Sequence, residues 1–141
     1  VRAYKHEGYY EEMTSLQKYY EESLKLLHKE YRDEVFRKAN VYTKVKDSSP
    51  TRYGDNAVVK NAIIADGCDI EGEVYDSVIF RGVKIGRGTV VRNCILMQNT
   101  LTGENVSLNC IIADKNVVIK DKRTLSGSEN HPFFISKGTV I

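Results

Sequence analysis

The chain carries almost no net charge and lacks the features that would connect it to nucleic acid or to a membrane. Its 141 residues hold 21 lysines and arginines against 19 aspartates and glutamates, a formal net charge of +2. Such a balance creates no strong positive field, which excludes binding to nucleic acid or anionic lipid by charge alone. No apolar run approaches the roughly 18 residues of a membrane span, and no signal-peptide pattern is visible. We therefore expect a cytoplasmic protein with neither kind of partner.

Cysteine is also scarce, and its three residues are Cys68, Cys94 and Cys110. An odd number without C-x-x-C spacing argues against a metal site. Cys94 and Cys110 are predicted to share one position of the repeat described below, which would stack them on neighbouring coils within reach of a disulfide. Because cysteine is commonly buried and cytoplasmic thiols stay reduced, we predict free, buried thiols.

The first 50 residues show a helical pattern and contain only one glycine. Apolar residues recur at helical spacing, at Leu16, Tyr20, Leu24 and Leu27. Thr14 followed by Gln17 matches a capping box, so we place the helix start at Thr14. A break is predicted at 28–31, followed by a short second helix that ends at Phe36.

A change in composition marks the boundary between two parts of the chain. Residues 41–45 alternate apolar and polar side chains like a strand. Residues 46–56 are rich in turn formers, and Pro50 keeps Ser49 out of the helical region. We therefore expect a helical part over 1–45, a linker over 46–56 and a β part over 57–141.

The β part repeats itself every fifteen to seventeen residues. One apolar series is Val58, Val74, Val90 and Val106, each sixteen residues after the last. A second series is Ile64, Ile79, Leu96 and Ile112, and a third is Ile70, Ile85, Leu101 and Ile119. Small residues stand two positions before the second series, at Ala62, Ser77, Cys94 and Cys110. Short apolar stations joined by turns predict a hexapeptide-type parallel β-helix, in which stacking buries what one coil cannot. The aperiodic tail 124–141 is predicted to cap the stack.

The repeat holds no group suited to acyl transfer, the best-known chemistry of hexapeptide coils. Those enzymes typically use a histidine base between coils, whereas His6, His28 and His131 all lie outside 57–119. No phosphate-binding loop opens a helix, and we assign Gly86 and Gly88 to a turn of the coil. No catalytic residue and no metal ligand are predicted in this chain.

Two groups of charged residues are open to a functional and to a structural interpretation. The carboxylates Glu7, Glu11 and Glu12 are either remnants of a site or the solvated edge of the helical part. Four basic residues could bind a phosphorylated effector on the outside of the coil or simply be solvated surface: Arg81, Lys84, Arg87 and Arg92. The effector-binding residues are therefore unassigned.

The chain resembles, from end to end, the C-terminal portion of bacterial glucose-1-phosphate adenylyltransferase (ADP-glucose pyrophosphorylase). The similarity is carried by AYKHEGYYEEMTSLQKYYEESLKLL, VYTKVKDSSPTRYG, SVIFRGVKIGRGTVVRNCILMQ and IIADKNVVI, in this order and at similar spacing. The resemblance implies that residues 1–45 end a nucleotidyltransferase domain and that the β-helix is left-handed and serves subunit assembly and allosteric control. It also implies that the nucleotide loop precedes Val1, so that this chain is a C-terminal fragment.

One departure from the family bears on catalysis. Active members carry a motif of the form G-Y-W-x-D-I-G-T, whose Asp lies at the sugar-nucleotide and metal site. Gly8 and Tyr9 match this motif, but Glu12 takes the place of the Asp. The altered motif resembles the non-catalytic companion subunit of the GlgD type, which assembles with a catalytic subunit for glycogen synthesis. Glu12 is thus a substrate-binding residue by resemblance only, and Mg²⁺ is implied for the parent family rather than for this chain.

We therefore expect a regulatory or assembly segment of a glucose-1-phosphate adenylyltransferase subunit in glycogen biosynthesis. The parent complex implied by the resemblance is a homo- or hetero-tetramer that converts ATP and glucose-1-phosphate to ADP-glucose and pyrophosphate. One alternative is a fragment of an active sugar-1-phosphate nucleotidyltransferase, including a guanylyltransferase for mannose-1-phosphate. A second, with less support, is a hexapeptide acyltransferase.

Overall fold

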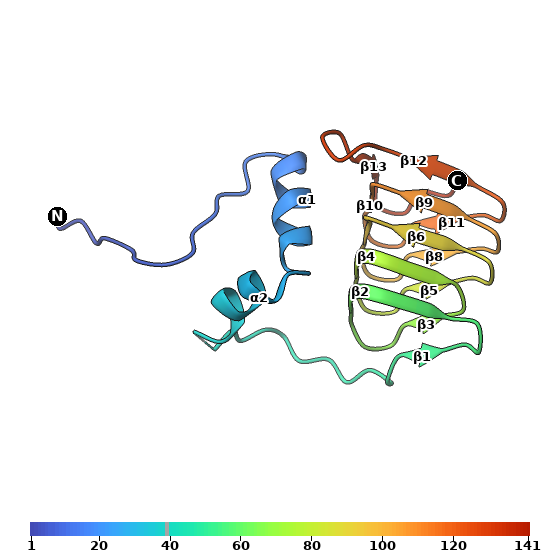
Figure 1. Cartoon of the computed structure of the whole chain (residues 1–141), viewed down its shortest axis with the longest axis horizontal. Helices are drawn as coiled ribbons and strands as arrows, with labels where there is room; N and C mark the ends of the chain where they lie inside the picture. The colour runs from blue at the N-terminus through green and yellow to red at the C-terminus, as the bar shows by residue number, and fades with distance from the viewer. Residues whose placement is uncertain (39) are drawn as a thin grey trace.

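The computed structural model describes residues 1–38 and 40–141 and consists of a short helical junction beside a coil of parallel strands (Figure 1). The helices are α1 (Leu16–Lys25) and α2 (Lys29–Phe36). The strands are β1 (Arg52–Tyr53), β2 (Val58–Ile64), β3 (Asp69–Ile70), β4 (Glu73–Ile79), β5 (Lys84–Ile85), β6 (Val90–Arg92), β7 (Ile95–Leu96), β8 (Leu101–Thr102), β9 (Ser107–Asn109), β10 (Ile111–Ala113), β11 (Val118–Ile119), β12 (Thr124–Ser126) and β13 (Phe133–Ile135).

The helix α1 begins one residue later than the capping-box pattern predicted. Ser15 is the N-cap, with extended backbone, and its hydroxyl accepts a 3.0 Å hydrogen bond from the amide of Lys18. Both Thr14 and Ser15 are good capping residues, so sequence spacing alone chose the wrong one. The break lies at 26–28, slightly before the predicted position. The predicted end of the second helix at Phe36 is confirmed.

The stretch between the helices and the coil forms no strand where one was predicted. Residues 41–45 have no regular structure, and the side chains of Val41, Tyr42 and Val45 are exposed. An alternating pattern makes a strand only where a neighbouring strand supplies backbone partners, and none of the described strands pairs with this stretch. Pairing starts instead at β1, within the stretch expected as a linker, where Arg52 lies opposite Asp69.

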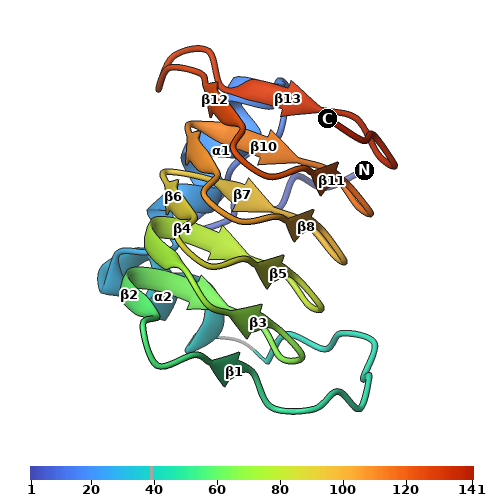
Figure 2. The same ribbon diagram turned by 90° about the vertical axis from the view of Figure 1, so that its right-hand side faces the viewer.

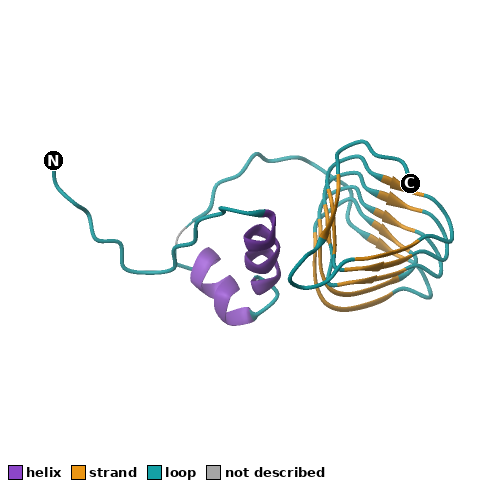
Figure 3. Cartoon of the chain, turned by 90° about the horizontal axis from the view of Figure 1, so that it is seen from above, coloured by secondary structure: helices purple, strands orange, loops and turns teal. Residues whose placement is uncertain are grey.

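The coil has a triangular cross-section, seen from above in Figure 3. All of its strand pairs are parallel, and they form one ladder β1-β3-β5-β8-β11 and a second, larger sheet that contains β2 and β4. The long strands β2 and β4 bend at Asn61 and Asp76, whose φ angles are 50° and 46°, and so contribute to two faces each. Figure 2 shows the coils stacked from β1 to β13. The predicted fold class, mainly β with a parallel β-helix after a helical junction, is confirmed.

The coils differ in length, and the first predicted series is wrong at every step: Val59, not Val58, lies opposite Val74. Val74 lies opposite Val91, seventeen residues later, and Val91 lies opposite Leu108. The corner between β5 and β6 has four residues, 86–89, whereas the corner between β3 and β4 has two, 71–72. In the first coils, residues that lie opposite one another are fifteen positions apart in the sequence. The two extra residues in the later corner raise this interval to seventeen.

The same shift corrects the other two series. Leu96 lies opposite Ala113, so Ile112 points outward instead of into the core. Ile85 lies opposite Thr102, so Leu101, which lies opposite Lys84, points outward and is 37% exposed. The core itself is a continuous column of buried aliphatic side chains that runs through the coils, as predicted from the repeat.

The three cysteines are free and buried, as predicted. The prediction that Cys94 and Cys110 share one position is wrong. The amide of Cys94 donates a 3.0 Å hydrogen bond to the hydroxyl of Ser77 on the preceding coil, whereas Cys110 occupies a corner with a φ of 53°. Burial raises the pKa of the Cys94 thiol to about 12, so this thiol is protonated at neutral pH.

The tail 124–141 continues the stack. β12 pairs with β9, β13 pairs with β10, and Val140 forms a bridge with Val118. The tail thus adds one more turn, with a loop over 127–132 inserted at one corner. Phe133 and Phe134 are 47% and 42% exposed on this last turn.

Candidate functional site

The helix α1 lies against the outer surface of one face of the coil (Figures 1 and 3). Outward side chains of this face form a row in which Val78, Ile95 and Ile112 lie opposite one another. Tyr20 packs on this row, is 2% exposed, and donates a 2.6 Å hydrogen bond to the carbonyl oxygen of Asn93. Burial raises the pKa of Tyr20. The outward row is apolar because a helix covers it, and the helical junction is thereby fixed to the coil.

A buried carboxylate lies on the other side of α1. Glu22 is 3% exposed and accepts hydrogen bonds from Lys25 at 2.6 Å, from Lys18 at 3.0 Å and from the hydroxyl of Tyr9. Burial by itself would raise the pKa of Glu22, but the hydrogen bonds from Lys25, Tyr9 and Lys18 outweigh it and lower the pKa to about 2. The hydrogen bond to Glu22 raises the pKa of Tyr9 to about 12. Glu22 is therefore ionised and Tyr9 neutral over the whole physiological range.

The three carboxylates proposed as remnants of a site lie in different surroundings. Glu11 pairs with Lys18 at 2.9 Å and so belongs to the group around Glu22. Glu7 makes an exposed pair with Lys5 at 3.8 Å. Glu12 is exposed, and no hydrogen bond or ion pair of its side chain occurs among residues 1–38 and 40–141. The predicted role of Glu12 stays a prediction.

The described residues do not by themselves fit a magnesium ion. Mg²⁺ needs several oxygen ligands in near-octahedral geometry. Across the part of the chain that the structure describes, no group of three or more His, Cys, Asp or Glu side chains is placed to hold a metal ion. We therefore derive no chemical step through Mg²⁺ from this chain.

The four basic residues of the coil do not converge. The guanidinium of Arg92 stacks 4.0 Å from the centre of the Tyr75 ring. Arg87 points toward Glu71, with 3.9 Å between a guanidinium nitrogen and a carboxylate oxygen. Lys84 lies on β5 and Arg81 at the corner before it, and neither makes an ion pair among the described residues. The hypothesis of one effector site made by these four side chains is not supported by their positions.

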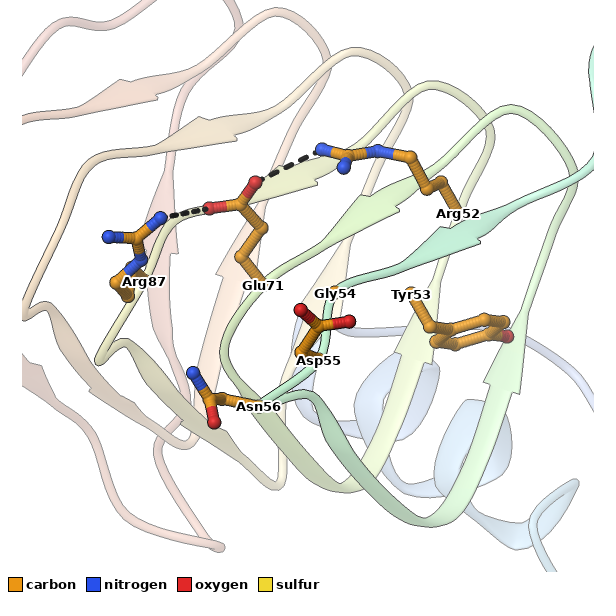
Figure 4. A pocket seen from close by; sticks show the side chains of 7 residues that line it. All are labelled: Arg52, Tyr53, Gly54, Asp55, Asn56, Glu71 and Arg87. Atoms are coloured by element: carbon orange, nitrogen blue, oxygen red, sulfur yellow. Dashed lines mark hydrogen bonds and ion pairs between the residues drawn. The ribbon is translucent and has the colours of Figure 1, made fainter.

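A cavity of about 350 Å³ lies at the first coil (Figure 4). Its lining includes Arg87 and Arg52, and no pattern in the sequence indicated that Arg52 would lie there. Arg52 of β1 donates hydrogen bonds to Asp69 at 2.7 Å and to Glu71 at 3.0 Å. Figure 4 shows Glu71 between the two guanidinium groups, with Asp55 and Asn56 on the opposite side of the cavity. Arg52 was overlooked because it falls in the expected linker, and only the pairing of β1 with β3 brings it to these carboxylates.

This cavity can accept a polar or anionic group. Arg52 and Arg87 keep 62% and 70% of their side chains exposed, so their remaining N–H donors face solvent. Glu71 already neutralises part of their charge, and Asp55 adds another negative group to the lining. An anion would have to compete with Glu71 for both guanidinium groups, which predicts weak binding.

Comparison with known proteins places the coil in a family. A profile described as GlmU-like, C-terminal hexapeptide, matches residues 44–140. The chain belongs to this family. No helix in the described ranges is long and apolar enough to cross a membrane.

Some relatives are similar to the chain over its helical junction as well as over its coil. It is 41% identical over 138 residues to the glycogen biosynthesis protein GlgD of Bacillus subtilis, covering 97% of the chain and 40% of that protein. It is 42% identical over 119 residues to GlgD of Geobacillus stearothermophilus, covering 84% of the chain and 35% of that protein. It is 32% identical over 155 residues to glucose-1-phosphate adenylyltransferase of Desulfitobacterium hafniense, covering 99% of the chain and 38% of that protein.

These similarities confirm the resemblance read from the sequence. The match to the Bacillus subtilis protein covers almost the whole chain, so it includes the helical junction as well as the coil. The chain spans about 40% or less of the length of these curated relatives. The segment is therefore a β-helix with its junction, related to the adenylyltransferases of glycogen biosynthesis.

Proposed function

We propose that this chain serves assembly and regulation in a subunit of the ADP-glucose-forming system of glycogen biosynthesis. The observation that carries the proposal is the similarity over 97% of the chain to a glycogen biosynthesis protein, junction and coil together. The parent complex would convert ATP and glucose-1-phosphate to ADP-glucose and pyrophosphate with the help of Mg²⁺. It would do so in the cytoplasm.

The non-catalytic kind of subunit agrees best with the region around Glu12. By the resemblance, this residue takes the position at which the active family carries Asp, and it is exposed with no bonded partner among the described side chains. The extra methylene of Glu moves the carboxylate relative to an Asp, which matters where a metal ligand must lie within tenths of an ångström. The proposed partner is the catalytic subunit, in a hetero-tetramer.

The last turn of the coil offers a surface for assembly. Phe133 and Phe134 are about half exposed at the end of the stack. Exposed aromatic side chains are enriched in the central parts of protein interfaces, and burying them against another subunit would remove apolar surface from water.

The proposal is tested by co-expressing the full-length parent protein with a catalytic glucose-1-phosphate adenylyltransferase subunit from the same organism. We expect the two to co-purify as a hetero-oligomer and the parent to change the activation of the catalytic subunit. Phe134→Ser should weaken the association, whereas Lys60→Ser, an exposed change on β2, should not. Two subunits that elute separately at micromolar concentration would overturn the proposal.

A second candidate is an enzymatically active parent, favoured by the carboxylate that Glu12 keeps. The parent alone would then form ADP-glucose, and Glu12→Ala would abolish the turnover while Glu7→Ala, a nearby exposed change, would not. Absence of turnover by the parent alone, with the partner active in the same buffer, would remove this candidate.

A further inference from the structure

The helix α1 contacts two parts of the chain on opposite sides. Successive residues of an α-helix are rotated by about 100°, so side chains two positions apart point in nearly opposite directions. Tyr20 faces the coil and bonds to Asn93, while Glu22 faces away from it and bonds to Tyr9. Tyr9 belongs to the segment 8–13, which contains Glu12. A single helical turn thus joins the coil to this segment.

The carboxylate of Glu22 is directed at the segment. Two of its donors, Lys18 and Lys25, are neighbours on α1 at helical spacing, and the third, Tyr9, comes from outside the helix. Lys18 extends the contact because its ammonium group also pairs with Glu11 at 2.9 Å. The segment is therefore held at two points, Tyr9 and Glu11, through one buried charge.

Apolar packing supports the same arrangement. The Tyr9 ring meets the Tyr31 ring of α2 edge to face, with centroids 6.4 Å apart. A small cavity of about 160 Å³ beside Glu22 is lined by Tyr9 and Met13 from the segment, by Leu26 at the end of α1 and by Val35 of α2. The segment lies against both helices, and the N-terminal end of the chain extends away from them (Figure 1).

We propose that Glu22 is a positioning residue that holds the segment 8–13, and with it Glu12, at a place set by the coil through Tyr20. Any movement of the coil relative to the rest of the parent protein is then transmitted by α1 to this segment. The importance of the link for the parent rests on the proposed function, whereas the link itself is a property of this chain.

The link is tested on the 141-residue chain by NMR. Heteronuclear NOE values report fast motion of the amides of residues 9–12, and the ring carbon signal of Tyr9 in protein labelled on tyrosine reports its titration. In the wild type we expect restrained amides and a Tyr9 pKa near 12. Glu22→Gln should free the amides of 9–12 and lower the Tyr9 pKa toward its ordinary value of about 10, with the signals of the coil unchanged.

Three further variants make the test decisive. Glu21→Gln changes the exposed neighbour, which accepts a hydrogen bond from Gln17, and should alter neither signal. Tyr9→Phe removes the hydroxyl from the segment side and should free residues 9–12 even if Glu22→Gln fails to fold. Tyr20→Phe should loosen α1 on the coil while the Tyr9 pKa stays high.

Two results would overturn the proposal. One is an unchanged Tyr9 titration in Glu22→Gln together with unchanged amides of residues 9–12 in both Glu22→Gln and Tyr9→Phe. The other is loss of the coil signals together with those of 9–12 in Tyr9→Phe, which would mean that this contact holds the whole fold rather than the segment. Neither result depends on catalysis, so failure of this link is distinguishable from failure of the proposed function.

Discussion

The hydroxyl of Tyr20 donates a 2.6 Å hydrogen bond to the carbonyl oxygen of Asn93, which lies 73 residues further along the chain. This bond joins the helical junction to a corner of the coil, between a buried tyrosine and a partly buried asparagine. Stability of the junction should therefore depend on this one residue more than on any exposed tyrosine.

Tyr20→Phe should destabilise the junction by about 1 kcal/mol, because the ring is kept while the carbonyl of Asn93 loses its donor. For a chain of this size the melting temperature should fall by about 3 °C, measured from the helical circular dichroism signal at 222 nm. Tyr20→Ala should cost about 3 kcal/mol or more because packing is lost as well. Tyr42→Phe, at a side chain that is 89% exposed, serves as the control and should leave the melting curve unchanged.

The pH dependence of stability should show the Glu22 group at both extremes. The pKa of Glu22 is lowered in the folded chain from 4.5 to about 2. The ionised carboxylate therefore adds its full share to the free energy of unfolding above pH 4.5, and this share is lost as the pH falls toward 2. The pKa of Tyr9 is raised from 10.0 to about 12, so its contribution is complete below pH 10 and is lost as the pH rises toward 12.

Urea titrations of the wild type and Glu22→Gln at a series of pH values measure this effect. The stability difference between them should be constant from pH 5 to 9 and shrink on both sides. A difference that stays constant down to pH 2 would show that the ionised carboxylate is not what stabilises the junction.

Gly86→Ala should disrupt the corner between β5 and β6. A Cβ atom at this position would lie 2.2 Å from the carbonyl oxygen of Gly103 on the next coil, and this backbone atom can move only if the coils separate. We expect a loss of at least about 2 kcal/mol of stability, measured by thermal unfolding. Lys84→Ala, two residues earlier and exposed, is the control and should leave the stability nearly unchanged. Equal melting temperatures for the two variants would contradict the close approach of Gly86 to Gly103.

The three thiols should resist modification in the folded chain. Cys68, Cys94 and Cys110 are all buried, and the thiolate that reacts with alkylating or disulfide reagents is disfavoured at Cys94 by its pKa of about 12. At pH 8 we expect labelling of all three in urea and labelling slower by at least about 100-fold in buffer, followed by mass spectrometry. Rapid labelling of Cys94 in buffer would show that the coil opens there.

The repeat could be predicted from the sequence, but its register could not. Aliphatic residues recurring every fifteen to seventeen positions identify a stacked coil whatever its details. Val90 and Val91 are both valine, so periodicity cannot decide which of them points inward. The choice is made by the four-residue corner before them, whose length only the pairing of Val74 with Val91 reveals.

The residues of the junction illustrate a different limit. The helical spacing of Lys18, Glu22 and Lys25 is visible in the sequence, and it suggests ordinary surface ion pairs. The burial of Glu22 depends on a tyrosine thirteen residues earlier that folds back over the helix. Arg52 was missed for a similar reason, since a contact between distant chain positions leaves no local signal.

The uneven corners of the coil have a consequence for how this chain tolerates changes in length. Neighbouring coils are held by backbone hydrogen bonds between strands, and these are kept whether a turn has fifteen or seventeen residues. Insertions and deletions at a corner therefore alter the surface there without disturbing the column of aliphatic side chains inside. The loop over 127–132 shows how far such an addition can go, because β13 still lies in register with β10 after it. Peptides grafted at these corners would be displayed on a rigid support with fixed vertical spacing.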